Sequence, residues 1–338
     1  PIGELERRLP ELLRDRVRIC HDLGRDPAFD TRLIGWLNEF RGKPRRDFHA
    51  PDEIVELGHI VHDMRLYKSR GELTAMRRAA RVSADAHILA MQACKPGLNE
   101  ADIHATLVHH FMREHCETAY SPIVGGGANA CVLHYIANNA QLKNGDLVLI
   151  DAGCEYRGYA ADITRTFPVN GRFSGPQRAV YEIVLASQLA AIDKIAVGND
   201  WDQPHLASVE VIVQGLKDLG LLQGDLHGLI ESGAYRRFYM HRVGHWLGMD
   251  VHDVGDYKVY GQWRQLEAGM TMTVEPGIYI GTDDTEAPEK FRGIGIRIED
   301  DVALQKSGPQ VLSAAAPKTI TDIEYLMRED DLVQEALL

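Results

Sequence analysis

The stretch of sequence that decides the fold runs over residues 146–169 and reads DLVLIDAGCEYRGYAADITRTFPV. Four consecutive apolar residues lead into Asp151 at the end of one expected strand, and a second strand is expected over 159–169. The glycine-containing linker 153–158 joins them, which predicts a hairpin. Each strand contains a carboxylate, Asp151 or Asp162, and a carboxylate within an apolar strand is costly to desolvate.

Two further carboxylates occupy the same kind of position in the second half of the chain. Glu275 interrupts an apolar run and is followed by Pro276 and Gly277, and Glu299 interrupts the run GIGIRI at 293–298. One such residue is often structural, for example at a capped strand end or in a buried pair with arginine. Four of them, two from each half, would repel one another unless cations lie between them. A pair of divalent metal ions would supply that charge.

Three histidines lie close together in residues 240–253, which read MHRVGHWLGMDVHD. His241 and His245 are four residues apart, a spacing that would place them on one helix face. The segment lacks the HExxH zinc pattern, and a lone histidine here would more often be a hydrogen-bonded core residue. Gly244 and Gly248 allow close backbone approach, which favours a packed site. We therefore expect this segment to add a nitrogen ligand to the carboxylates.

The expected donor set, four carboxylates and one imidazole, is rich in oxygen and contains no thiolate. Such a set suits Mn²⁺, which we expect as the ion, and it is compatible with Fe²⁺, Co²⁺ and Zn²⁺. Carboxylates that bridge two ions about 3.5–4 Å apart are typical of sites that activate water for hydrolysis. The sequence thus predicts a hydrolytic centre with two divalent metal ions.

Around these residues the hydrophobic periodicity predicts helices and strands in two similar runs. The expected helices cover 69–93, a stretch from Asn99 onward, 177–197 and 206–219, and the expected strands cover 146–152, 159–169, 270–280 and 293–304. Each run has the order helix, helix, strand, strand. This order predicts an α+β domain built from two pseudo-duplicated halves.

The amino-terminal part predicts a smaller, incomplete unit. Residues 1–48 indicate helix, short strand and helix, with the strand at 17–20 and the second helix at 30–40, ended by the Gly-Lys-Pro of 42–44. This is too little to close an α/β domain by itself. The expected domains are a partial α/β domain (1–64), a catalytic domain (65–328) and a carboxyl-terminal tail (329–338).

The composition of the 338 residues is that of a folded globular protein, with 45% hydrophobic and 25% charged residues. Thirty-seven Lys and Arg against 49 Asp and Glu leave a net charge of −12, which argues against nucleic acid as a partner. No apolar run approaches the roughly 20 residues of a membrane span, and no apolar signal region opens the chain. Five scattered cysteines without CxxC spacing favour a reducing, cytoplasmic location.

The sequence around the acidic residues resembles the aminopeptidase P family of pita-bread metallopeptidases (M24B). Matching stretches include HWLGMDVHDVG at 245–255, TVEPG at 273–277 and GIRIEDD at 295–301. The resemblance covers residues 65–328. The family's metal ligands, in the order Asp, Asp, His, Glu, Glu, fall on Asp151, Asp162, His245, Glu275 and Glu299.

This resemblance implies a two-metal hydrolase that releases the N-terminal residue from peptides with proline at the second position. It implies that Asp151 binds one ion and that His245 and Glu275 bind the other. Asp162 and Glu299 would bridge the two ions, and Glu275 would also carry the proton taken from water. The partners implied are these peptides and further copies of the chain, in a dimer or tetramer.

The resemblance also implies residues that act on the substrate. His252 would hydrogen-bond the tetrahedral intermediate. His134 would be a catalytic residue and would also line the pocket that receives the proline of the substrate. Arg297 lies two residues before Glu299 on the same strand face, so it would orient a carboxylate, contact the substrate, or form an ion pair with a neighbouring acid. The substrate-binding residues implied in this way are His134, His241, Tyr279 and Arg297.

Other members of the same fold family are the alternatives. Prolidase shares these ligands but cuts only dipeptides, and the short segment 281–291 resembles aminopeptidase P more closely. Methionine aminopeptidase fits less well around 245–248. A non-catalytic pita-bread binding module or a metal-free creatinase-like enzyme lacks metal ligands that are all present here. The sequence also departs from the family after Tyr135, where residues 136–139 read IANN and an acidic residue is usual.

Overall fold

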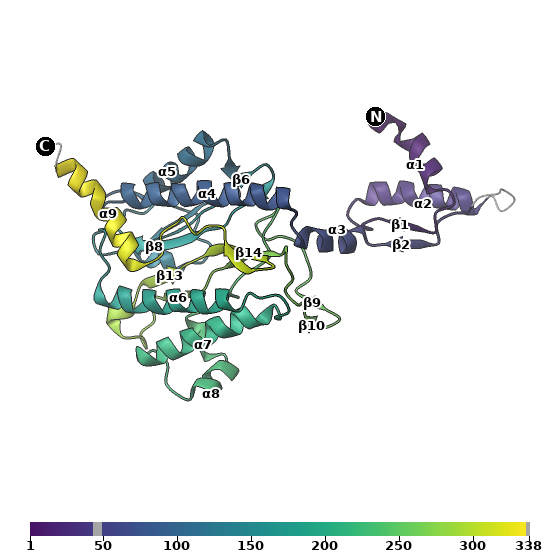
Figure 1. The fold of residues 1–338 in the computed structure, drawn as a ribbon. Helices are drawn as coiled ribbons and strands as arrows, with labels where there is room; N and C mark the ends of the chain where they lie inside the picture. Colours follow the sequence, from purple (N-terminus) through teal and green to yellow (C-terminus); the bar gives the residue numbers. More distant parts are fainter. Residues whose placement is uncertain (43–48, 336–338) are drawn as a thin grey trace. The chain divides into compact units, whose positions relative to one another are not determined.

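The computed structural model describes residues 1–42 and 49–335 (Figure 1). The chain forms two compact units, Pro1–Met64 and Arg65–Leu338, and each is described here by itself. The predicted helix stop at 42–44 lies partly outside the described residues. The predicted tail begins inside the last helix, α9 (Ile320–Glu335), and residues 336–338 lie outside the described part of the chain.

The first unit is a small α/β arrangement. Its elements are η1 (Ile2–Glu4), α1 (Leu5–Leu13), β1 (Arg18–Cys20), α2 (Pro27–Arg41), β2 (Glu53–Val55) and the start of α3 (Leu57–Leu66). The two strands pair in parallel, with Ile19 opposite Ile54. Asp26 caps α2, whose buried face carries Trp36 and Phe40. The predicted helix, strand, helix order is therefore present.

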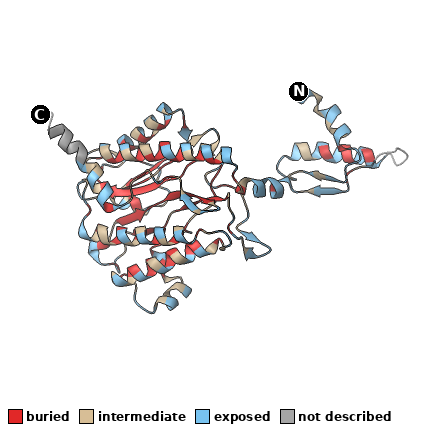
Figure 2. Cartoon of the chain, in the orientation of Figure 1, coloured by how far each residue is buried: buried red, intermediate tan, exposed pale blue. Residues whose placement is uncertain are grey.

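The second unit repeats the order helix, helix, strands, which confirms the expected fold class. The first half contains α4 (Arg70–Ala93), α5 (Glu100–Arg113), β3 (Glu117–Thr118), β4 (Ile123–Gly126), η2 (Gly127–Cys131), β5 (Leu147–Asp151), β6 (Cys154–Tyr156), β7 (Tyr159–Ala160) and β8 (Thr164–Pro168). In Figure 1 the strands of this unit lie between α4 on one side and α6 and α7 on the other. Figure 2 shows these central strands as mostly buried.

The second half adds the elements that close the domain. They are α6 (Gly175–Asp193), α7 (Asp202–Asp218), α8 (Leu226–Glu231), η3 (Ala234–Arg237), β9 (Lys258–Val259), β10 (Gln262–Trp263), β11 (Thr271–Val274), β12 (Gly277–Ile280), η4 (Glu289–Phe291), β13 (Ile294–Arg297), β14 (Asp300–Gln305) and β15 (Gly308–Val311), before α9. The two halves meet where β8 runs beside β13. There the Thr166 hydroxyl donates to the Arg297 carbonyl (2.9 Å), and the Glu299 amide donates to the Thr164 carbonyl (3.0 Å).

The predicted hairpin is present, but its second strand is not continuous. β5 pairs antiparallel with β8, with Asp151 opposite Thr164. Residues 161–163 separate β7 from β8, because the Asp162 amide donates to the Asp301 carboxylate (3.1 Å) rather than to a neighbouring strand. The expectation of one strand over 159–169 was therefore wrong, because the Asp162 amide forms its hydrogen bond with Asp301 in the other half of the domain and not with a neighbouring strand.

The two predicted strands of the second half are also each broken, and both break at a carboxylate. The expected strand 270–280 divides into β11 and β12 at Glu275 and Pro276, and 293–304 divides into β13 and β14 at Ile298 and Glu299. β11 pairs with β14, and β12 pairs with β13. The two predicted strands are therefore interrupted at facing positions. Proline has no amide to donate, which favours a break at this point.

The segment with three histidines forms no helix, and its residues 243–247 pair with β11, so the expectation that His241 and His245 share a helix face was wrong. This segment lies along β11, where the Thr273 amide donates to the His245 carbonyl (2.9 Å). A Cβ at Gly244 would lie 2.0 Å from the Thr273 carbonyl oxygen, which confirms the expected close approach. Backbone pairing with the neighbouring strand thus replaces a helix, and Gly244 permits it.

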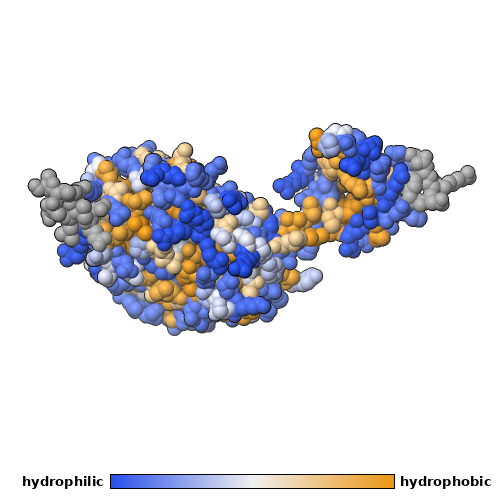
Figure 3. Space-filling model, turned by 45° about the horizontal axis from the view of Figure 1, so that its top comes forward, coloured by the Kyte–Doolittle hydropathy of each residue, from blue (hydrophilic) through white to orange (hydrophobic). Residues whose placement is uncertain are grey.

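No helix in the described ranges 1–42 and 49–335 is long and apolar enough to cross a membrane. On the face drawn in Figure 3, hydrophilic residues surround separate hydrophobic patches. The buried apolar residues instead gather between the helices and strands of the second unit, with Phe111, Val148 and Ile296 in one core cluster.

We expect Gly153→Ala to destabilise the second unit by about 3 kcal/mol or more, because an added Cβ would lie 1.8 Å from the Ala161 carbonyl oxygen. Urea unfolding measures the change in free energy. The matched control is Gly175→Ala at the exposed start of α6, where no atom lies within 4 Å of the added carbon. Equal unfolding midpoints for the two variants would contradict the close packing at Gly153.

Candidate active site

A cavity of about 550 Å³ lies in the second unit, and most of the site residues expected from the sequence line it. Its lining includes all five expected metal ligands together with His134, His241, His252 and Arg297. Tyr279 is buried and reaches the site through hydrogen bonds to His241 (2.9 Å) and Arg297 (3.0 Å). Segments from both halves of the domain thus converge on one cavity.

Each carboxylate enters the cavity from a point where a strand ends. Asp151 is the last residue of β5, and Asp162 lies just before β8. Glu275 follows β11, and Glu299 lies between β13 and β14. A strand end frees the side chain from the strict alternation of a continuous strand, so these four can turn toward a common point.

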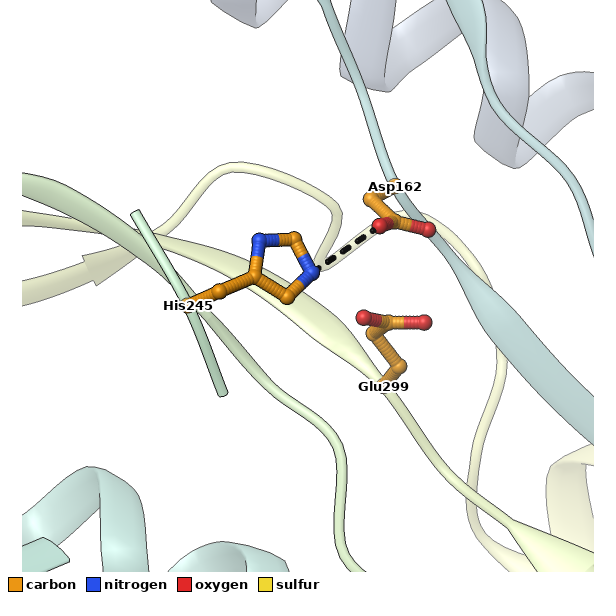
Figure 4. Close-up of side chains that lie close together, drawn as sticks. All are labelled: Asp162, His245 and Glu299. Carbon is orange, nitrogen blue, oxygen red and sulfur yellow. Dashed lines mark ion pairs between the residues drawn. The ribbon is translucent and has the colours of Figure 1, made fainter. Parts of the chain in front are cut away.

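Asp162, His245 and Glu299 form a close group of potential metal ligands (Figure 4). Each offers one ligand atom, and these atoms all lie within 4.8 Å of one another. His245 Nε2 is 3.4 Å from Asp162 Oδ2. His245 Nδ1 lies 2.9 Å from the Trp246 carbonyl oxygen, which places the proton of the neutral ring on Nδ1 and directs Nε2 at the carboxylates.

Arg297 holds the other end of the carboxylate cluster. Its guanidinium donates to Asp151 Oδ2 (2.5 Å) and to the Tyr279 hydroxyl (3.0 Å), and its Nε donates to Thr164 Oγ1 (3.1 Å). Of the roles considered for Arg297, the structure shows the ion pair with an acid. Arg297 also lines the cavity, so a contact with substrate is compatible with its place.

Burial and neighbouring charges perturb the pKa of every carboxylate in the cluster. Burial raises the pKa of Asp151, against the effect of the Arg297 charge. Burial raises the pKa of Glu275 to about 7, and burial with neighbouring carboxylates raises that of Glu299 well above its usual value. Asp162 differs, because the hydrogen bond and charge of His245 outweigh burial and lower its pKa.

His245 acts as a cation in this arrangement. Burial by itself would lower its pKa, but the hydrogen bond to Asp162 and the charge of Glu275, whose Oε1 lies 3.6 Å away, raise it to about 9. The imidazolium and the Arg297 guanidinium together supply positive charge inside the carboxylate cluster. An oxygen-rich site that gathers protons and positive charge in this way fits divalent metal ions, whose binding would displace the protons.

The sequence patterns did not identify two hydroxyl-bearing residues of the site, Tyr120 and Thr164. Tyr120 Oη lies 2.6 Å from Asp151 Oδ1 and 2.5 Å from Asp162 Oδ1, and Thr164 Oγ1 donates to Glu299 Oε2 (2.7 Å). Nothing in the sequence marks Tyr120, which lies in a loop. Thr164 follows Asp162 by two residues, and that spacing along a strand would have pointed to a shared face.

The three remaining histidines border the cavity in different ways. His241 is held by Tyr279, and burial lowers its pKa to about 3, so the ring is neutral at pH 7. The ring of His252 lies edge-on to that of His245, with centroids 4.4 Å apart. His134 is an exposed residue of the lining.

Three aromatic residues and one arginine of the cavity lining were also not recognised in the sequence. Trp201 packs against Tyr257 with ring centroids 4.8 Å apart, and the Arg242 guanidinium lies 4.9 Å from the centroid of Trp263. All four residues line the cavity. Their positions come from separate loops and from the β9–β10 hairpin, so no local sequence pattern links them.

The departure from the family after Tyr135 has a structural explanation. Asn138 in this stretch is buried and has a positive φ of 44°. Its side chain accepts from the Val124 amide (2.9 Å) and donates to the Pro122 carbonyl (2.8 Å). It therefore fixes the loop that carries His134 rather than supplying a charge to the cavity.

Comparison with known proteins places the chain in a family. The sequence model of metallopeptidase family M24 matches residues 74–306. The Xaa-Pro aminopeptidase of Haemophilus influenzae is 51% identical over 330 residues, covering 96% of this chain and 73% of that protein. The Xaa-Pro aminopeptidase of Escherichia coli K12 is 44% identical over 328 residues, covering 96% of this chain and 74% of that protein.

Solved structures agree with the sequence comparison. The Pseudomonas aeruginosa aminopeptidase PepP superposes with a TM-score of 0.93 at 54% identity, covering 98% of this chain and 75% of that one. A zinc-substituted Escherichia coli aminopeptidase P in complex with product gives 0.91 at 43% identity, covering 97% and 74%.

The chain belongs to metallopeptidase family M24. The resemblance to aminopeptidase P seen in the sequence is confirmed, and with it the assignment as a metal-dependent peptidase. The chain spans about three quarters of the length of these two relatives.

We expect divalent metal binding at pH 7 to release protons, because His245 has a pKa of about 9 and Glu299 a pKa raised well above its usual value. His245 is therefore mainly protonated at pH 7 before the ion enters. Affinity should therefore rise as pH increases from 6 toward about 9. Titration calorimetry in two buffers of different ionisation enthalpy measures the protons released. Identical heats in both buffers would contradict the shifted pKa values.

Proposed function

We propose that this chain is a two-metal hydrolase that removes the N-terminal residue from peptides with proline at the second position. The observation that carries the proposal is the convergence of Asp162, His245 and Glu299, with Asp151 and Glu275, on one cavity. The specificity is supported by the two bacterial relatives named Xaa-Pro aminopeptidase, each aligned over 96% of this chain.

We propose that Asp151 binds one ion, that His245 and Glu275 bind the other, and that Asp162 and Glu299 bridge the two. The short distances among Asp162, His245 and Glu299 support a shared position for these three. Two divalent ions in this set would supply the positive charge that polarises the substrate carbonyl and lowers the pKa of water. Mn²⁺ is the ion we propose, because the set offers one nitrogen against carboxylate oxygens.

The protein groups at the site would transfer protons and would hold the metal ligands in a fixed orientation. Glu275, whose carboxylate lines the cavity and lies 3.6 Å from His245, would take a proton from water and return it to the leaving amine. Arg297 and Tyr120 fix the orientation of Asp151 through contacts of 2.5 and 2.6 Å. They would hold that carboxylate still while charge develops at the reacting carbonyl.

The histidines at the cavity would bind the substrate. His252 would donate to the oxygen that becomes negative in the tetrahedral state, since its ring stands beside the proposed ligand His245. His134 and His241 would contact the proline side, and Tyr279 keeps His241 in place through its hydroxyl. Neutral His241 presents no charge to the apolar proline ring.

We further propose that residues 1–64 are part of an amino-terminal α/β domain, that the chain forms a homo-oligomer, a dimer or tetramer, and that it works in the cytoplasm. The parallel β1–β2 pair beside α2 supports the first proposal. The free cysteines among the described residues are compatible with a reducing compartment.

We expect the purified protein to cleave Ala-Pro-Ala at least as well as Ala-Pro, and not to cleave Ala-Ala-Ala appreciably. Removal of metal with a chelator should abolish this activity, and Mn²⁺ should restore it best. Release of alanine, followed by chromatography, measures each rate. Cleavage of the dipeptide alone would move the assignment to prolidase, and full activity of thoroughly metal-stripped protein would remove the metal-dependent proposal.

We expect Asp162→Asn to lose more metal affinity than Asp151→Asn. A bridging carboxylate would serve both ions and offset their mutual repulsion, whereas a terminal one would serve a single ion. Calorimetry of both variants, with circular dichroism to show that each is folded, measures affinity and stoichiometry. Equal losses in the two variants would argue against a bridging role for Asp162.

A further inference from the structure

His252 is carried by a loop whose shape depends on its neighbour. In the segment Trp246–Val254 the Asp253 amide donates to the Trp246 carbonyl (2.9 Å), which folds the loop back on itself. No regular helix or strand covers this segment. The position of the His252 ring is therefore set by contacts of the loop with the rest of the unit.

The main contact is a buried ion pair. The Asp253 side chain is 1% exposed, and Asp253 does not line the cavity. Lys68 Nζ lies 3.5 Å from Asp253 Oδ2, and the Lys68 side chain is also 1% exposed. Arg65 reaches the other oxygen, Asp253 Oδ1, and also pairs with Asp250 (2.8 Å).

The loop closes tightly around this carboxylate. A Cβ at Gly248 would lie 2.1 Å from Asp253 Oδ2 and 2.9 Å from Lys68 Cε, so only glycine fits. The Val254 amide donates to Asp253 Oδ1 (3.0 Å). Residues on both sides of His252 are thereby fixed to one anion.

Lys68 itself has a fixed position in the body of the domain. Its amide donates to the Gly269 carbonyl (2.8 Å), and the next residue, Ser69, caps α4 in a capping box with Glu72. Burial lowers the pKa of Lys68 to about 8, which leaves the ammonium mainly protonated at pH 7. Without Lys68, the buried Asp253 carboxylate would keep Arg65 as its cation but lose one of its two partners, which is destabilising locally.

We propose that Lys68 and Asp253 are positioning residues that hold His252 beside the metal ligands, with Arg65 as a second support. This inference rests on the proposed function, because it assumes that His252 acts on the substrate. The pair touches neither the cavity nor a proposed metal ligand through its charged groups. Its effect on catalysis would therefore pass through the loop.

The first test compares Lys68→Met with Arg70→Met, a change of an exposed cation two residues away. We expect Lys68→Met to lower kcat by about 10- to 100-fold, as small displacements of a catalytic group do. Metal stoichiometry and KM should change little, and Lys68→Arg should recover most of kcat. Arg70→Met should behave as the wild type. Unchanged kcat in folded, metal-loaded Lys68→Met would overturn the proposal.

The second test is a double-mutant cycle with His252→Ala, which alone should lower kcat by about 10²–10³-fold. If Lys68 acts through His252, Lys68→Met should cause no further loss in the His252→Ala background, within about twofold. Losses that multiply would assign Lys68 to general stability instead and overturn the proposal. If Lys68→Met does not fold, Asp253→Asn takes its place in the same cycle.

Hydrogen exchange gives a readout that does not need activity. The amides of residues 246–254 should exchange about tenfold faster or more in Lys68→Met, since breaking a buried pair costs several kcal/mol. Those of residues 147–151 in β5 should keep the wild-type rate. Unchanged exchange in the loop would overturn positioning by Lys68. Absence of Xaa-Pro cleavage by the wild type, with faster loop exchange in the variant, would instead reject the proposed function alone.

Discussion

The structure of the second unit depends on the gathering of four carboxylates in one buried cavity. Like charges at such distances cannot all remain ionised without compensation. The protein compensates with the Arg297 guanidinium, with an imidazolium at His245 and with the hydroxyls of Tyr120 and Thr164. Burial and the neighbouring carboxylates raise the pKa values of Glu275 and Glu299, which favours their neutral forms. A site balanced in this way has the oxygen donors and the negative charge that suit divalent metal ions.

A second layer of buried charge lies behind the carboxylates and joins the two halves. Arg165 follows Thr164 directly, and its guanidinium donates to the Glu299 carbonyl (2.5 Å) and to Asp300 Oδ1 (2.7 Å). Lys318 reaches the other oxygen of Asp300 at 2.6 Å. Burial opposes ionisation of Asp300, but the two cations outweigh it and lower its pKa to about 2. The backbone that carries Glu299 is thus fixed from behind.

The same logic extends to the loop that carries His252. There the anion is Asp253, and the cations come from the segment that leads into α4. Charged groups that do not face the cavity therefore set the position of groups that do. In this unit the buried ion pairs serve orientation, both between strands, as for Arg165 in β8 and Asp300 in β14, and in the loop that carries His252.

The sequence by itself determined the order of helices and strands, the α+β class and the residues that carry charge into apolar surroundings, because periodicity and misplaced polarity are local properties. Asp151, Asp162, Glu275 and Glu299 were recognisable for that reason. The tertiary structure alone decided where strands break, that residues 243–247 pair with β11 instead of forming a helix, and which hydroxyls and aromatic side chains complete the cavity. Tyr120 meets Asp151, and Arg297 meets Asp151 across 146 residues of chain. Such contacts are set by the packing of two halves of the domain, which no local pattern records.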